Sequence, residues 1–239
     1  MKKISIIGYG RFGKILATIL NEFEIEIYDS KIIKNRTKYQ RVSFERAINN
    51  EIVFLATPIR TFESLIKNIA KFKNCKTTIV DVCSVKSFPV KVMKKYLPEK
   101  MGIIATHPLF GPDSFSPFRE LKIVMHNERD IYNKYDYLKN IFLNKSIQVI
   151  EMNPDQHDKL AAYSQGATHF IGRVLKNSGV KSTPINTLGF NALLGVIDQT
   201  CNDSSDLFID LQKYNPYTNE MINQFIQNID LIKTTILEK

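Results

Sequence analysis

Six residues near the amino terminus carry the first chemical signature in the chain, Gly8-Tyr9-Gly10-Arg11-Phe12-Gly13. They follow an apolar run directly and open a stretch with helical spacing, the context in which the pattern G-x-G-x-x-G binds a dinucleotide. The first glycine permits a tight turn, the second lets the backbone approach a pyrophosphate, and the third lets the helix pack closely on the strand. The N-terminus of the helix adds free N–H groups and a positive dipole end. We therefore predict a dinucleotide site here rather than a simple turn of another α/β fold.

A carboxylate stands at the end of the second expected strand. Asp29 lies about 20 positions after Gly8, the spacing of an acid that accepts hydrogen bonds from the adenosine ribose. Because a carboxylate at this place repels a 2′-phosphate, NAD is favoured over NADP as the cofactor. Basic residues that could still accommodate NADP follow at Lys31, Lys34 and Arg36. Further residues expected along the nucleotide crevice are Ser30, Thr57 and Pro58.

Two more polar segments follow expected strands, Asp81-Val82-Cys83-Ser84-Val85-Lys86 and Thr106-His107-Pro108-Leu109-Phe110-Gly111-Pro112. Ligands of open α/β sheets sit beyond the carboxyl ends of the strands, so Ser84 and His107 should converge near a nicotinamide. A neutral imidazole, with a pKa of about 6.5, can accept the proton of a hydroxyl group that is being oxidised. A single histidine is more often structural, but His107 ends an apolar strand before a loop rich in proline and glycine. This position favours a catalytic role.

The elements that position these residues are short β-branched runs alternating with helical stretches, as in βαβ units. The expected strands are 3–7, 24–28, 52–56, 77–82, 102–106, 122–126 and 148–152, and the expected helices between them are 11–23, 62–72 and 90–96. After Asn153-Pro154-Asp155 only helical patterns follow, at 156–176, 184–201, 204–214 and 217–237. The sequence therefore predicts an α/β fold: a Rossmann-type, doubly wound, mostly parallel sheet over residues 1–152, then an all-helical domain over 153–239.

The amino-acid composition excludes several classes of protein. Hydrophobic residues make up 44% and charged residues 24%, which excludes general disorder. The apolar runs are shorter than the ~18 residues of a spanning helix, and no secretory apolar segment follows the amino terminus, so we expect no membrane association and a cytoplasmic location. The net charge of +9 comes from scattered bases and indicates solubility rather than nucleic-acid binding. The three cysteines have no metal-binding spacing, so we predict no metal.

The motifs taken together resemble the prephenate and arogenate dehydrogenases of tyrosine biosynthesis. The resemblance covers nearly the whole chain and rests on five segments in family order: GYGRFG, DVCSVK, THPLFGPDS, QHDKLAAYSQGATHFIGRVL and DSSDLFIDLQKYNPY. Phe110, Pro112 and the SQ…TH…GR pattern are most similar to the plant-type arogenate branch. The resemblance implies hydride transfer from a cyclohexadienol to the nicotinamide with loss of CO₂. By the same resemblance, His107 would assist deprotonation of the hydroxyl group, and Ser84 would support His107 and the nicotinamide end.

The family pattern also implies substrate residues in the helical domain: His157, Gln165, His169 and Arg173. At ~100° per residue of a regular helix, Gln165 lies about 80° and His169 about 120° around the helix from His157, giving one broad polar face. The alternative is an ordinary solvated helix face. Where prephenate-preferring relatives place an arginine, an ungapped register places Asp198. Because an aspartate can pair with an ammonium group, which arogenate has and prephenate lacks, the substrate preference leans toward arogenate.

The apolar stripe of the last expected helix, over 217–237, is wide for a helical domain of this size, and we expect it to form an isologous homodimer rather than to pack only within the chain. After the last helix no room is left for a fused mutase or ligand-sensing domain, so any feedback by tyrosine should act at the active site. Two alternative functions remain: another Rossmann-fold reductase or hydroxyacid dehydrogenase, and a nucleotide-sensing protein without turnover.

Overall fold

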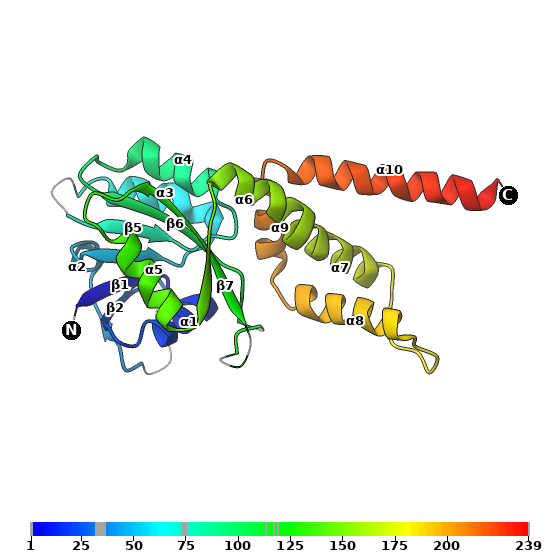
Figure 1. The fold of residues 1–239 in the computed structure, drawn as a ribbon, viewed down its shortest axis with the longest axis horizontal. Helices are drawn as coiled ribbons and strands as arrows, with labels where there is room; N and C mark the ends of the chain where they lie inside the picture. Colours follow the sequence, from blue (N-terminus) through cyan, green and yellow to red (C-terminus); the bar gives the residue numbers. More distant parts are fainter. Residues whose placement is uncertain are drawn as a thin grey trace. The chain divides into compact units, whose positions relative to one another are not determined.

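The computed structural model describes residues 2–31, 37–72, 76–112, 114–116, 118 and 120–238. Lys34 and Arg36, which were considered for NADP binding, lie outside these residues. The chain divides into two compact units, Met1–Pro154 and Asp155–Lys239 (Figure 1). The division falls slightly beyond the boundary expected after residue 152.

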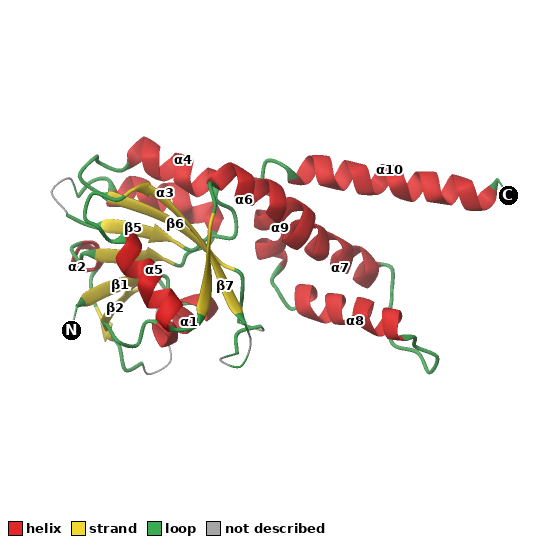
Figure 2. Ribbon diagram, in the orientation of Figure 1, coloured by secondary structure: helices red, strands yellow, loops and turns green. Residues whose placement is uncertain are grey.

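The first unit is built on one twisted sheet (Figure 2). Its strands in the described residues are β1 (Lys3–Ile7), β2 (Glu24–Tyr28), β3 (Gln40–Arg41), β4 (Ile52–Leu55), β5 (Thr78–Asp81), β6 (Gly102–Pro108), β7 (Leu121–Arg129) and β8 (Ile147–Glu151). The strand order is β3-β2-β1-β4-β5-β6-β7-β8. Every neighbouring pair is parallel except β6 and β7, which run antiparallel. The prediction of a mostly parallel Rossmann-type sheet is confirmed.

The helices of this unit are α1 (Arg11–Ile19), α2 (Phe44–Ile48), α3 (Phe62–Ile69), α4 (Ser87–Tyr96) and α5 (Tyr135–Asn144), with a 3₁₀ turn at Ile59–Thr61. The sequence prediction missed β3, α2 and α5. Strand β3 and helix α2 are too short to show a periodic pattern. Helix α5 does show one, because its buried residues Tyr135, Leu138 and Phe142 are spaced by three and four.

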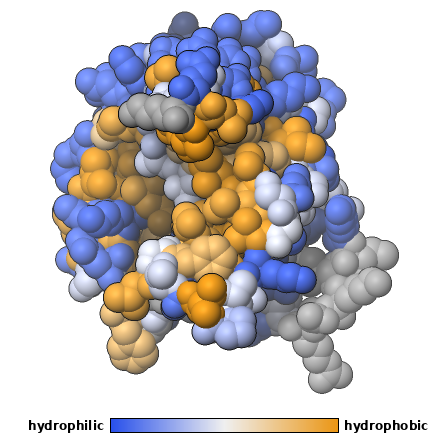
Figure 3. Space-filling view, turned by 90° about the vertical axis from the view of Figure 1, so that its right-hand side faces the viewer, coloured by the Kyte–Doolittle hydropathy of each residue, from blue (hydrophilic) through white to orange (hydrophobic). Residues whose placement is uncertain are grey.

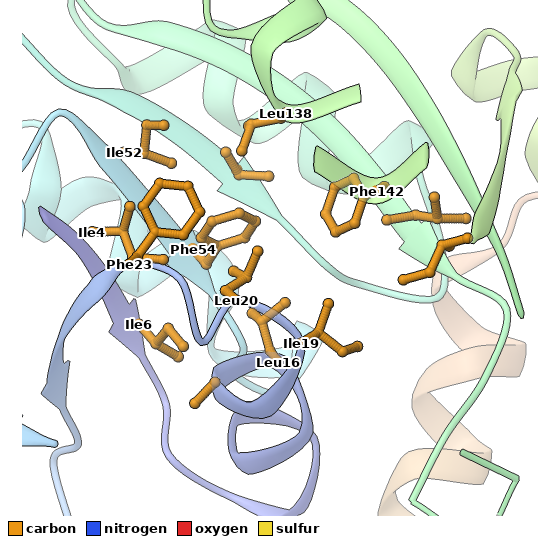
Figure 4. Packing of buried hydrophobic residues seen from close by; sticks show 14 of the residues in the cluster. Ile4, Ile6, Leu16, Ile19, Leu20, Phe23, Ile52, Phe54, Leu138 and Phe142 are labelled. Carbon is orange, nitrogen blue, oxygen red and sulfur yellow. The ribbon is translucent and has the colours of Figure 1, made fainter. Parts of the chain in front are cut away.

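The main hydrophobic core lies between the sheet and helices α1 and α5 (Figure 4). Ile52 and Phe54 of β4 point into this core, while Val53 and Leu55, which are equally buried, point to the opposite face. Such continuous burial along a strand is typical of a parallel sheet with helices on both faces. The strands themselves are buried, so we expect ligands to bind at the loops that follow the carboxyl ends of the strands.

The second unit is helical throughout its described residues. Its chain continues from α6 (Pro154–Ala161) through a π-helical turn (Ala162–Gly166) into α7 (Ala167–Asn177), and then forms α8 (Leu188–Cys201), α9 (Ser205–Tyr214) and α10 (Thr218–Leu237). The side chains of Thr187 and Ser204 cap α8 and α9 by accepting hydrogen bonds from Phe190 N and Leu207 N. The all-helical character expected for this region is confirmed. Among the described residues no helix is both long and apolar enough to cross a membrane.

Helices α7 and α8 approach each other closely at Gly172. A Cβ atom built on Gly172 would lie 2.1 Å from Oγ1 of Thr200, a hydroxyl that donates to the Val196 carbonyl at 2.8 Å. Gly172→Ala should therefore destabilise the fold by about 1–3 kcal/mol, which corresponds to a Tm roughly 2–12 °C lower.

Thermal unfolding followed by circular dichroism measures the effect of Gly172→Ala. The matched control is Gly195→Ala in α8, where an added Cβ meets no described atom within 4 Å. This control should keep or raise the Tm, because alanine is the better helix former. A Gly172→Ala variant at least as stable as the control would contradict the close approach.

Candidate active site

The glycine-rich turn joins β1 to α1 and has no room for side chains at two of its three glycines. Gly8 has a φ of 96°, and a Cβ on it would lie 2.4 Å from the Ala56 carbonyl oxygen. A Cβ on Gly13 would lie 2.1 Å from the Gly8 carbonyl oxygen. At Gly10 an added Cβ would meet no described atom within 4 Å. The open space in front of Gly10 is where a pyrophosphate would approach the backbone.

Asp29 fixes this turn to the end of β2. Its Oδ2 accepts a hydrogen bond from Tyr9 N at 2.8 Å, and its Oδ1 accepts one from Lys31 N at 2.8 Å. A carboxylate has about four acceptor positions, so two remain for the hydroxyl groups of a ribose. Ser30, the next residue, is exposed. Asp29 thus has the position and the acceptor capacity that its sequence spacing predicts.

Thr57 follows β4, the strand that pairs with β1 on the side away from β2. Its Oγ1 is buried and has no hydrogen-bond partner among the described residues. Its Cγ2 lies 3.1 Å from the position of a Cβ on Gly8, so Thr57 adjoins the glycine-rich turn. A buried hydroxyl without a partner is rare in proteins and here indicates a place for a polar ligand group. The residues present therefore fit a dinucleotide. Pro58 and Arg11, also predicted here, are exposed at the start of the following turn and of α1.

His107 lies inside β6, next to its last residue, rather than just after the strand. The side chain is 3% exposed, and its residue pairs with Val124 of β7. Ser84 follows the neighbouring strand β5 and is half-buried. The loop after β6 is held against the glycine-rich turn, because the ring centroids of Phe110 and Phe12 are 6.3 Å apart. The order β1-β4-β5-β6 thus brings the predicted cofactor turn, Ser84 and His107 to the carboxyl ends of consecutive strands.

A buried ion pair lies between the segments that carry Ser84 and His107. Lys86 and Asp81 are 1% and 0% exposed, and Nζ of Lys86 donates to Oδ1 of Asp81. The same Nζ donates to the Thr106 carbonyl at 2.6 Å, and Thr106 Oγ1 donates to the Asp81 carbonyl at 2.6 Å. Burial raises the pKa of the Asp81 carboxyl, and the positive charge of Lys86 opposes this shift. The sequence prediction quoted both residues in a motif but gave them no role.

Three predicted substrate residues of the second unit lie one helical turn apart. Gln165 Oε1, His169 Nδ1 and Arg173 Nε are all buried without a hydrogen-bond partner among the described residues. Burial lowers the pKa of His169, while the charge of Asp203 opposes this shift. Arg173 donates through Nη2 to the Asp203 carbonyl at 2.7 Å. A cation, an imidazole and an amide with unused hydrogen-bonding capacity form a group suited to an anionic, polar ligand.

Two details of the predicted substrate face change in the structure. The helix assumed to be regular over 156–176 contains the π-helical turn Ala162–Gly166, so the angles calculated from His157 are wrong. A π turn adds about one residue, which rotates the residues that follow by about 100°. His157 itself is 3% exposed, and its Nδ1 lies 2.8 Å from Oδ1 of Asp158. Asp198 is exposed on α8.

Asp203 is a candidate that the sequence prediction missed. It lies in the quoted segment DSSDLF, immediately before Ser204, the residue that caps α9. An aspartate next to the start of a helix is common for structural reasons, so nothing in the sequence indicated that Asp203 has a functional role. Only its contact with Arg173 and the effect of its charge on His169 indicate one.

Comparison with known proteins places these features in a family. Residues 24–128 match the family model described as prephenate dehydrogenase, nucleotide-binding domain, and residues 174–239 match that described as TYRAAT1-like, C-terminal domain. Arogenate dehydrogenase 2, chloroplastic, from Arabidopsis thaliana is 32% identical over 97% of this chain and 69% of its own length. This chain belongs to the prephenate/arogenate dehydrogenase family. The resemblance seen in the motifs is confirmed, and the family model matched by residues 24–128 is that of a nucleotide-binding domain, as the glycine-rich motif predicts.

Other members of the family cover the chain to different extents. Arogenate dehydrogenase 1, chloroplastic, from Arabidopsis thaliana is 34% identical over 93% of this chain but only 37% of its own length. A crystal structure of prephenate dehydrogenase from A. aeolicus with hydroxyphenyl propionate and NAD⁺ has a TM-score of 0.75 at 20% identity, covering 100% of this chain and 91% of that one. That of Synechocystis arogenate dehydrogenase has a TM-score of 0.70 at 17% identity, covering 99% and 92%. These structures show that the fold is shared.

Proposed function

We propose that this chain oxidises and decarboxylates a cyclohexadienol, arogenate or prephenate, with a nicotinamide dinucleotide as hydride acceptor. The observation that supports this most is the convergence of three features at the carboxyl ends of consecutive strands of the first unit. A glycine turn with open space at Gly10, the Ser84 loop and His107 all lie there. A nucleotide-sensing protein would need the turn but no proton acceptor beside it.

In this proposal the protein orients the substrate and moves one proton. When bound, the cofactor supplies the hydride acceptor, which is chemistry of its own. His107 accepts the proton of the ring hydroxyl, because an imidazole beside a reacting group is a common general base. Ser84 supports His107 and the nicotinamide end of the site. Loss of CO₂ then makes the ring aromatic, and this change drives the reaction.

We infer that NAD is preferred over NADP. The carboxylate of Asp29 would lie beside the ribose, where it accepts hydrogen bonds from hydroxyl groups and repels a 2′-phosphate. The nearby Lys31 contributes its backbone N–H to Asp29.

We also infer that the polar group of the helical unit formed by Gln165, His169 and Arg173 binds a charged part of the substrate, and that arogenate is the preferred substrate. The guanidinium of Arg173 would hold a carboxylate, and a neighbouring acid would hold the ammonium group of arogenate. The sequence placed Asp198 in that role. Asp203 fits it better, because its charge acts on His169 and its carbonyl accepts from Arg173, whereas Asp198 is exposed.

Asp203→Asn should lower kcat/KM for arogenate by about 10- to 100-fold, because it removes a charged hydrogen-bond partner, and should change kcat/KM for prephenate much less. Asp198→Asn is the matched control and should leave both values within about twofold of the parent. Steady-state kinetics with both substrates measures the ratio. An unchanged preference for arogenate in Asp203→Asn would contradict the role of Asp203. A loss of this preference in Asp198→Asn alone would assign the ammonium group to Asp198.

We propose that the functional form is a homodimer formed through the helical unit. Apolar side chains remain exposed along α8 and α10, namely Leu188, Leu193, Ile226, Ile229, Leu231, Ile232, Ile236 and Leu237. Figure 3 shows apolar side chains gathered on the face of the molecule that it draws. Exposed apolar area of this extent is unusual in a monomer. Sedimentation equilibrium at micromolar concentration should give twice the mass of the chain, and the mass of one chain would contradict the proposal.

The enzymatic proposal is tested with purified protein, both dienols and both oxidised cofactors. Formation of reduced nicotinamide is followed at about 340 nm, and we expect arogenate with NAD to give the highest kcat/KM. Turnover of neither dienol, together with tight cofactor binding, would favour the nucleotide-sensing alternative.

A cytoplasmic location remains a prediction; the names of the two Arabidopsis thaliana relatives place those proteins in the chloroplast.

A further inference from the structure

We propose that Lys86 is a positioning residue that fixes His107 relative to Ser84, a role that rests on the proposed function of this site. The basis is one ammonium group with two buried acceptors on different strands. Nζ of Lys86 donates to the Asp81 carboxylate at the end of β5 and, at 2.6 Å, to the Thr106 carbonyl within β6. The Thr106 carbonyl belongs to the peptide group that leads into His107.

The sheet itself cannot supply this contact. Strand β5 ends at Asp81, which pairs with Ala105, whereas β6 continues to Pro108. Beyond Ala105 the side of β6 toward β5 therefore has no ladder partner, and a buried backbone carbonyl without a partner is costly. Lys86 takes the place of the missing strand.

The ion pair also closes the loop that carries Ser84. Oδ1 of Asp81 accepts from Cys83 N at 3.0 Å and from Lys86 Nζ, so the carboxylate holds the loop at both of its ends. Residues that are register partners point to the same face of a sheet, so Asp81, Ala105 and His107 share one face. The side chain of Asp81 therefore lies on the same face of the sheet as that of His107, and the ammonium group of Lys86 contacts both segments.

The burial of the Lys86–Asp81 ion pair is easier to explain by a role in positioning His107 than by a gain in folding stability. Lys86 and Asp81 are 1% and 0% exposed, and Asp81 Oδ2 has no hydrogen-bond partner among the described residues. Burying two charges costs desolvation free energy that their attraction often does not recover, and apolar replacements of such pairs are often as stable. A geometric function gives a reason for this costly arrangement.

The test compares three variants of the full-length protein: Lys86→Met, the double variant Asp81→Asn with Lys86→Met, and Lys67→Met as a control. Lys67 pairs with Glu63 on the surface, so the control removes an exposed ion pair by the same substitution. The double variant leaves no buried charge, so it should fold even if Lys86→Met does not.

We expect kcat to fall by about 10- to 100-fold in Lys86→Met and in the double variant, with the Kd for NAD within about twofold of the parent. Lys67→Met should retain the parent kcat. The kinetics are measured well below the Tm of each variant, so that lower stability alone cannot reduce kcat. A folded double variant with the parent kcat would overturn the proposal, because in it nothing donates to the Thr106 carbonyl from position 86.

A second readout does not need turnover. The protein has four histidines, so labelling the histidine rings gives a small set of imidazole signals, which single substitutions can assign. We expect the His107 signal to shift or broaden in the double variant while those of His126, His157 and His169 stay in place. An unmoved His107 signal would overturn the positioning role. A moved signal in a protein that turns over neither dienol would support the positioning role and overturn the proposed function instead.

Discussion

Replacing His107 with asparagine should lower kcat for the preferred dienol by about 10²- to 10⁴-fold, the usual contribution of a general base. Asparagine is close in size to histidine and can still donate a hydrogen bond, but it cannot take up a proton at neutral pH. The effect should therefore appear in the chemical step. The His107 side chain is only 3% exposed, so a polar replacement that keeps its hydrogen-bonding capacity is the least disruptive choice.

The measurement is kcat and kcat/KM for the preferred dienol, with the Kd for NAD determined separately. We expect kcat to fall while the Kd for NAD stays within about twofold of the parent, because the substitution removes only the proton acceptor. His126→Asn is the matched control, because His126 lies on the adjacent strand β7 and its Nε2 is 3.2 Å from Glu128. A His107→Asn variant with kcat within tenfold of the parent would show that another group takes the proton.

Replacing Gly13 with alanine should damage both the fold and cofactor binding. The added Cβ would lie 2.1 Å from the Gly8 carbonyl oxygen, and a backbone atom cannot move aside as a flexible side chain can. Helix α1 must then move away from the end of β1. We expect a loss of about 3 kcal/mol, a Tm roughly 6–12 °C lower, and a weaker affinity for NAD, because the helix N-terminus no longer meets the pyrophosphate.

Gly10→Ala separates the two effects. Gly10 has a φ of −76°, which alanine adopts readily, and its added Cβ meets no described atom within 4 Å. The Tm should stay within about 2 °C of the parent, while the Kd for NAD rises by about tenfold or more, a cost of about 1.4 kcal/mol. Thermal unfolding and calorimetric titration measure both quantities. Equal NAD affinity in Gly10→Ala and the parent would mean that the pyrophosphate lies elsewhere.

Local patterns along the sequence determined most of the first unit. The runs Lys3–Ile7 and Glu24–Tyr28 became strands with the expected bounds, because both are rich in isoleucine, a β-branched residue that favours extended backbone. The spacing from Gly8 to Asp29 indicated that the two residues lie close together. They do, because each follows one of two adjacent parallel strands, and Tyr9 N donates a hydrogen bond to Asp29. Helix α2 escaped notice because five residues are too few to show a period.

Only the tertiary structure decided what the side chains of the candidate site meet. The sequence contains Asp81, Lys86 and Thr106 in two quoted motifs, but the hydrogen bond from Lys86 to the Thr106 carbonyl depends on β6 extending beyond β5. In the same way, the π-helical turn invalidated angles calculated for a regular helix, and Asp203 was recognised only by its contact with Arg173. Sequence patterns report short-range periodicity and turn chemistry, whereas the contacts from Lys86 to Thr106 and from Arg173 to Asp203 join residues 20 and 30 positions apart, whose distances are set by packing.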